Sequence, residues 1–241
     1  MNPYGVNVNY TNIGGPLISL KVLYDKLPET TGCEKCEEIN GDKKDWCCKS
    51  INPSMYYVEF LAVWQEVQNK WSKIKKTALI VRAVKNYLSN KRHKGCIFYD
   101  DGCTIYSQRP LQCRSYGVID NESWEGRIRK IRDEKDVDAN IIKQCDLVSF
   151  VDGRKNMTAE EEDGWFQHTV ECEKRIGVSP SVLKLHDLPG GTYRTFHDHL
   201  LIELFEPSVL EMLTKLRMQN PSESDIDETA KLIQETLNGR N

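Results

Sequence analysis

The sequence predicts a mainly α-helical protein with an irregular, cysteine-rich metal-binding core. Two observations indicate helices: apolar residues recur at helical spacing over several long segments, and helix-start signals precede some of them. A third indicates the core: nine cysteines occur in 241 residues, and most lie in turn-rich segments of the first half. We therefore expect a short hairpin or loops to carry the cysteines, helices to pack around them, and a helical C-terminal part.

The N-terminal segments contain the first helix signals. Residues 1–20 are rich in Asn, Gly and Pro, which predicts a loose arm with a short strand at Leu17–Leu23. A helix should start at Asn52-Pro53, because asparagine is a good N-cap and proline fits the first helical turn. Apolar residues follow at helical spacing to Trp64, and a second such pattern predicts a helix over 72–88.

The C-terminal part contains clearer helix boundaries. Thr158-Ala-Glu-Glu161 is a capping box, and the helix that it starts should run through Ile176, with Gly177 as its C-cap. Further helices are expected over 193–205, 207–218 and 223–237. We divide the chain into a cysteine-cluster metal-binding domain, 1–150, and a helical region, 151–241, packed on the first.

Charge and composition exclude some classes of partner. The formal net charge of −3 argues against a general affinity for nucleic acid. No run of 18 apolar residues occurs, so we expect no membrane partner. The first 15 residues lack the basic and apolar regions of a secretory signal, which predicts a cytoplasmic protein. Clustered cysteines in that compartment bind metal or react more often than they form disulfides.

The segment Cys96 to Tyr116 reads CIFYDDGCTIYSQRPLQCRSY and contains three cysteines. Asp101-Gly102 is a tight-turn signal. Arg109-Pro110 should bend the chain again, because proline fixes φ and keeps its predecessor out of the helical region. Two such turns could aim the sulfurs of Cys96, Cys103 and Cys113 at one point.

Other cysteines add to the candidate ligand set. Cys33 and Cys36 form a CxxC knuckle that can chelate one ion, Cys47-Cys48 is an adjacent pair, and Cys145 lies in an apolar segment. Thiolates are soft ligands that suit zinc, copper(I) and iron–sulfur clusters. Eight thiolates fit two four-thiolate sites or one polynuclear site. The predicted metal ligands are Cys33, Cys36, Cys47, Cys48, Cys96, Cys103, Cys113 and Cys145.

This arrangement of cysteines resembles the zinc- or iron-chelating domain family, the cysteine-cluster proteins named for a CxxCxxCC signature. The resemblance covers roughly residues 30–150 and is most specific in the segment from Cys96 to Tyr116. Gly117 stands where the family usually has proline. Ten residues separate Cys36 from Cys47, where the family has two or three. The resemblance implies metal chelation, with iron–sulfur and zinc both proposed for the family.

Two arginines are candidate cofactor-binding residues. Four thiolates on zinc, or on an oxidised four-iron cluster, leave a net charge near −2, which a guanidinium from Arg109 or Arg114 would offset. Cys172 shares a helical stripe with apolar residues, so we expect it in the core. His197 and His199 lie two positions apart and do not share a helix face, which favours structural roles.

The function predicted from the sequence is metal binding, with an iron–sulfur cluster preferred to zinc because the thiolates outnumber what one zinc needs. Its role would be redox or modification-related. One alternative is a non-catalytic module with structural zinc that binds a protein partner through its helical C-terminal half; another is a metal-trafficking or thiol-sensing protein. The sequence names no catalytic residue and leaves open whether the protein is an enzyme. Metal should be needed to order the polar cysteine loops.

Overall fold

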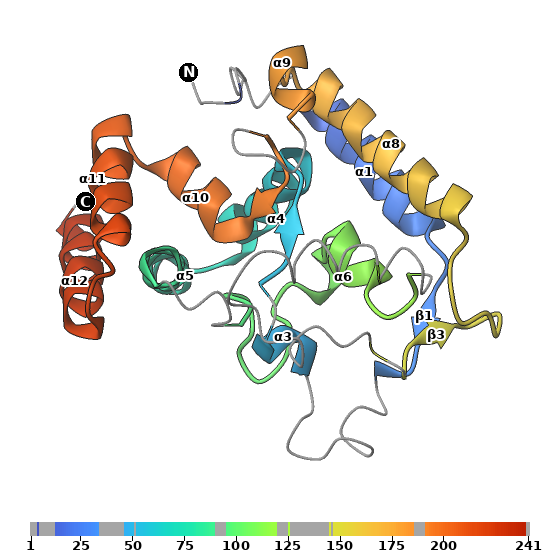
Figure 1. Cartoon of the computed structure of the whole chain (residues 1–241), viewed down its shortest axis with the longest axis horizontal. Coiled ribbons are helices and arrows are strands. Elements are labelled where there is room, and N and C mark those ends of the chain that lie inside the picture. The colour runs from blue at the N-terminus through green and yellow to red at the C-terminus, as the bar shows by residue number, and fades with distance from the viewer. Residues whose placement is uncertain are drawn as a thin grey trace.

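The computed structural model describes residues 4, 13–33, 46–50, 52–89, 95–119, 125, 145, 147–185 and 191–239, and this part is mainly helical (Figure 1). Its elements, in chain order, are α1 (Gly14–Lys26), β1 (Thr30–Thr31), α3 (Trp46–Ser50), β2 (Ser54–Met55), α4 (Tyr57–Lys70), α5 (Lys73–Leu88), the 3-10 turn η3 (Tyr106–Gln108), α6 (Leu111–Ser115), β3 (Ser149–Phe150), α8 (Ala159–Arg175), α9 (Pro180–Leu183), β4 (Arg194–Thr195), α10 (Phe196–Leu204), α11 (Pro207–Met218) and α12 (Glu223–Gly239).

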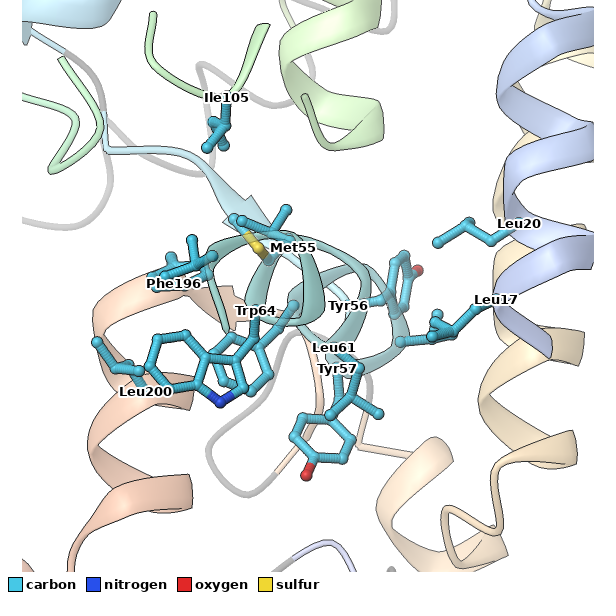
Figure 2. Packing of buried hydrophobic residues seen from close by; sticks show 14 of the residues in the cluster. Leu17, Leu20, Met55, Tyr56, Tyr57, Leu61, Trp64, Ile105, Phe196 and Leu200 are labelled. Atoms are coloured by element: carbon cyan, nitrogen blue, oxygen red, sulfur yellow. The ribbon is translucent and has the colours of Figure 1, made fainter. Parts of the chain in front are cut away.

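Helix α4 forms the centre of the main core. Its apolar side chains point in several directions, so neighbouring helices bury it from different sides. Figure 2 shows Leu17 and Leu20 of α1 on one side of α4 and Phe196 and Leu200 of α10 on the other. Helix α8 packs along α1, and the two lie side by side in Figure 1.

The predicted strand at Leu17–Leu23 is wrong, because this segment belongs to helix α1. Leu17, Leu20, Leu23 and Tyr24 are buried at helical spacing, on one face that contacts α4 and α8. The rest of the predicted N-terminal arm, apart from Tyr4, lies outside the described residues before position 13.

Two helix starts lie later than predicted because short strands precede them. Ser54–Met55 pairs antiparallel with Arg194–Thr195, so neither segment is helical. Helix α4 therefore begins at Tyr57 rather than near Asn52-Pro53, and α10 begins at Phe196 rather than at residue 193. This pairing joins residues about 140 positions apart, which local sequence signals do not reveal.

The other predicted helices are confirmed. Ser72 caps α5 by accepting a hydrogen bond from the Lys75 amide, and Thr158 and Glu161 form the predicted capping box of α8. Gly177 follows α8 with a positive φ of 93°, as a C-terminal glycine should. Helices α5, α10, α11 and α12 form a second apolar cluster, whose buried members are Val84, Leu88, Leu201, Leu213 and Ile226.

Both predicted regions contribute to shared layers of the fold. Helices α8 and α10 of the later region pack on α1, α4 and α5 of the earlier one. Strands β1 and β3 also pair antiparallel, with Thr30 opposite Phe150. The division of the chain near residue 150 remains a prediction. Among the described helices, none is long and apolar enough to cross a membrane.

Candidate metal centre

The predicted tight turn at Asp101-Gly102 is confirmed and closes a short hairpin. Tyr99 and Cys103 form an antiparallel bridge, and the Asp100 amide donates to the Gly102 carbonyl at 2.9 Å. Asp101 and Gly102 have positive φ values of 49° and 139°. Arg82 of α5 holds the start of the hairpin by donating from Nη1 to the carbonyls of Ile97 and Tyr99, at 2.7 and 3.1 Å.

Apolar side chains anchor the same segment in the main core. Ile97, Phe98 and Ile105 are all 5% exposed or less and belong to the cluster around α4. The Phe98 ring packs edge-on against Phe196 of α10, with ring centroids 4.5 Å apart. The cysteines of this segment are therefore carried by a chain that is already fixed to the helices.

The predicted bend at Arg109-Pro110 is also confirmed. Arg109 has a φ of −52° and a ψ of 133°, outside the helical region, and Pro110 is the N-cap residue of α6, the short helix that carries Cys113. The first amide of α6, from Leu111, donates to the buried carboxyl group of Glu59 at 2.7 Å. Glu59 also accepts from the Tyr24 hydroxyl and from the Tyr56 amide, so it joins α1, α4 and α6.

Glu59 was missed by the sequence reasoning, although one signal could have found it. It is the only charged residue in the otherwise apolar stretch Tyr57–Trp64 of α4, and such a residue must find partners if it is buried. Burial raises its pKa, while the hydrogen bonds from Leu111, Tyr24 and Tyr56 act in the opposite direction.

The adjacent pair Cys47-Cys48 lies on α3 and contacts the hairpin segment through the backbone. The Cys96 amide donates to the Cys48 carbonyl at 2.7 Å. Gly95 makes this approach possible: its φ is 71°, and a Cβ there would lie 2.4 Å from the Lys49 carbonyl oxygen. Two chain segments almost fifty residues apart are thereby brought together.

Five of the predicted ligands lie close enough for the charge of one to affect the pKa of another. Burial raises the pKa of Cys96 to about 12 and also raises the pKa of Cys103 and Cys113. A hydrogen bond with the neighbouring Cys47 thiol, together with burial, raises the pKa of Cys48. Each of these four thiols is also affected by the charge of other cysteines in the group. We call this group, Cys47, Cys48, Cys96, Cys103 and Cys113, the five-thiol group.

Cys145 lies beside Tyr116 and Gly117, which follow Cys113 closely in the chain. Gly117 packs against its backbone and Cβ, since a Cβ on Gly117 would lie 3.0 Å from the Cys145 carbonyl oxygen. Tyr116 is close enough to both Cys47 and Cys145 for their charges to raise its pKa, in addition to burial. Gly117 has a φ of 88°, which proline cannot adopt, so the glycine at this position has a structural reason.

The CxxC knuckle is only half described. Cys33 is exposed and lies two residues after the end of β1, whose partner β3 begins four residues after Cys145. Cys36 lies outside the described residues. Within the described part, no cysteine forms a disulfide, and no three His, Cys, Asp or Glu side chains are already arranged to hold a metal ion.

The two candidate arginines have different surroundings. The Arg109 guanidinium lies 3.7 Å from the centre of the Tyr106 ring, and its buried Nε has no hydrogen-bond partner among the described residues. Its positive charge acts on Cys103 and Cys113 and lowers their pKa, against the larger effect of burial. Arg114 instead donates to the carbonyls of Arg109 and Ser107, both at 2.7 Å, and lies 4.3 Å from the Tyr24 ring centre.

Cys172 lies in the core, as expected, and the two histidines contact different neighbours. Cys172 is 1% exposed in the main core. His199 contacts the Met55 carbonyl and the Tyr4 hydroxyl, both at 3.0 Å, and burial lowers its pKa to about 4. His197 contacts the Asn52 side chain at 2.7 Å instead, so the two rings have separate partners.

Comparison with known proteins gives no further identification: no family model, no curated protein and no solved structure matches this chain. The likeness to the cysteine-cluster family remains a prediction from sequence.

Proposed function

We propose that the protein binds a metal through its clustered cysteine thiolates and that an iron–sulfur cluster is the preferred occupant. The five-thiol group carries the proposal. Its members come from α3, the hairpin segment and α6, and their charges interact although they are up to 66 positions apart in the chain. Packing of reduced thiols alone does not require cysteines from three segments to lie within electrostatic range of one another.

The donors fit this class of occupant. Thiolates bind iron and zinc strongly, and the five-thiol group already exceeds the four ligands of one tetrahedral zinc. Cys33, Cys36 and Cys145 extend the proposed ligand set. A bound iron–sulfur cluster would supply one-electron transfer, whereas zinc would supply cross-linking of the chain segments.

The surrounding residues would orient and stabilise the ligands. Glu59 and Arg82 fix the backbone on both sides of the hairpin, and Gly95 allows the approach of α3. Arg109 places a positive charge beside Cys103 and Cys113, where ligation would leave excess negative charge. We propose a redox or modification-related role for the site on this basis.

Elemental analysis tests the proposal. Protein purified without oxygen should be brown and contain iron with acid-labile sulfide. Cys103→Ser and Cys113→Ser should each lose most of the metal, while Cys172→Ser should keep it and lose only core stability. Unchanged metal in both ligand variants would contradict the ligand set.

One contact favours a second candidate, a thiol sensor. The Cys47 and Cys48 side chains hydrogen-bond each other, so the adjacent pair is placed for reversible oxidation. Metal well below one atom per chain, together with loss of two titratable thiols on mild oxidation, would favour this candidate. Colourless protein with one or two zinc ions per chain would favour a structural zinc module.

A further inference from the structure

Helices α11 and α12 enclose a groove that is independent of the cysteines. It has a volume of about 560 Å³. Met212 and Leu216 of α11 and Leu232 and Ile233 of α12 form its apolar lining. Met212 is 52% exposed and Leu232 is 58% exposed, which is unusual for large apolar side chains that face a concave surface.

The fold of the described part uses only half of this lining: Leu216 and Ile233 pack against the second apolar cluster, whereas Met212 and Leu232 are exposed. Helix α11 buries Leu213, and α12 buries Ile226 and Ala230. Both helices pack on α5, and α12 makes the more extensive contact. In Figure 1 the pair lies at the edge of the molecule, away from α1 and α8. Their packing on α5 therefore leaves Met212 and Leu232 exposed.

The two helices that form the groove carry a net negative charge, although the charged residues of the lining itself, Glu211 and Lys215, balance each other. Residues 206–239 contain seven acidic and three basic side chains. Lys215 pairs with Glu211 at 2.7 Å, and Lys231 lies 3.9 Å from Glu235. The third basic residue, Arg217, lies over the Tyr87 ring of α5. Among the acids, Asp227 pairs with Lys85 of α5 at 2.6 Å. The smaller acidic excess that remains is exposed to solvent.

We propose that this groove binds an amphipathic helix of a protein partner, with an apolar face and basic flanks. A helix placed in an apolar groove uses side chains at positions i, i+3, i+4 and i+7 as anchors, and basic flanks complement the acidic excess. A second copy of this chain is a poorer occupant, because its own α11 and α12 carry the same negative charge and would repel.

Two synthetic peptides of about 18 residues test the proposal. Both carry the same leucine pattern at helical spacing; one has lysine at its polar positions and the other has glutamate. Fluorescence anisotropy should show that the lysine peptide binds at least about tenfold more tightly, and that added salt weakens its binding. Equal affinity for the two peptides would overturn the proposal.

Variants of the full chain locate the binding site. Met212→Ser and Leu232→Ser should each weaken binding of the lysine peptide by about tenfold or more, because an apolar anchor is lost. Met218→Ser is the matched control: Met218 is 79% exposed on α11 but does not line the groove, so its variant should bind normally. Circular dichroism confirms that all three variants fold.

Two outcomes would overturn the assignment. If Met212→Ser and Leu232→Ser bind the peptide as the wild type does, the groove is not its site. If light scattering shows a dimer that Leu232→Ser separates, the occupant is a second copy of the chain.

Discussion

Arg109 and Arg114 are five residues apart, yet their contacts predict different roles. Arg114 gives two hydrogen bonds to backbone carbonyls and holds the bend before α6. Arg109 leaves its buried Nε without a partner among the described residues, beside Cys103 and Cys113. The sequence places both arginines near the cysteines but cannot show which one donates hydrogen bonds to backbone carbonyls.

Alanine variants should separate these roles. Arg114→Ala should lower the free energy of unfolding by about 1–3 kcal/mol, because two carbonyls lose a charged donor. Arg109→Ala should change stability less but should lower the reduction potential of a bound cluster, because removing a positive charge disfavours the added electron. Urea unfolding and a redox titration measure the two effects; identical behaviour of the variants would contradict the assignment.

Glu173 gives a prediction about pH. This α8 side chain is fully buried and accepts from the Val58 amide of α4 at 2.6 Å. Burial raises its pKa from 4.5 to about 8, with the hydrogen bond acting in the opposite direction. The folded protein therefore holds this proton more tightly than the unfolded chain, and the resulting stabilisation is complete below pH 4.5 and is lost as the pH rises through 8.

Glu173→Gln should remove this contribution, because the amide cannot ionise. Urea unfolding from about pH 5 to about pH 9 should show the wild type losing stability on the order of a few kcal/mol. The variant should have a flatter profile over the same range. Parallel profiles would show that Glu173 is not the titrating group.

At the scale of elements, the approach of α3 to the hairpin segment depends on Gly95. Gly95→Ala should separate the two segments and reduce bound metal, because the new Cβ would lie 2.4 Å from the Lys49 carbonyl oxygen. Gly153→Ala is the matched control, since Gly153 has a similar φ of 89° but no atom near its Cβ position. Elemental analysis of both variants measures the effect, and equal metal content would contradict the role given to Gly95.

Elements with local signals could be predicted from the sequence. Ser72 and the Thr158 capping box locate the starts of α5 and α8, because caps act within one turn. The start of α4 could not be found in the same way, because β2 pairs with a strand near residue 194. The strand prediction at Leu17–Leu23 is wrong because a strand buries every second residue. The buried apolar residues of this segment instead recur at helical spacing.

The candidate site shows the same limit. The turns at Asp101-Gly102 and Arg109-Pro110 could be predicted because each depends on two adjacent residues. The contact of Gly117 with Cys145 and the hydrogen bond from Leu111 to Glu59 depend on tertiary packing, which one sequence does not reveal.

At the scale of the molecule, the structure changes what metal removal should do. The sequence predicts that ligation orders all the cysteine loops, but Ile97, Phe98 and Ile105 are buried in the helical core. In metal-free protein, residues 96–117 should therefore resist protease, while the segment around α3 should be cut first. Mass spectrometry of the first fragments checks this order. A first cut within 96–117 would mean that the apolar anchors are insufficient without metal.

X-ray absorption at the metal edge of protein purified without oxygen tests cysteine ligation most directly. We expect a first shell made of sulfur only, at about 2.3 Å from iron or zinc, because every proposed ligand is a cysteine. Cys113→Ser should reduce the amount of metal that gives this signal. A first shell dominated by nitrogen or oxygen would contradict a metal centre built from the five-thiol group. So would an unchanged amount of sulfur-coordinated metal in both Cys103→Ser and Cys113→Ser.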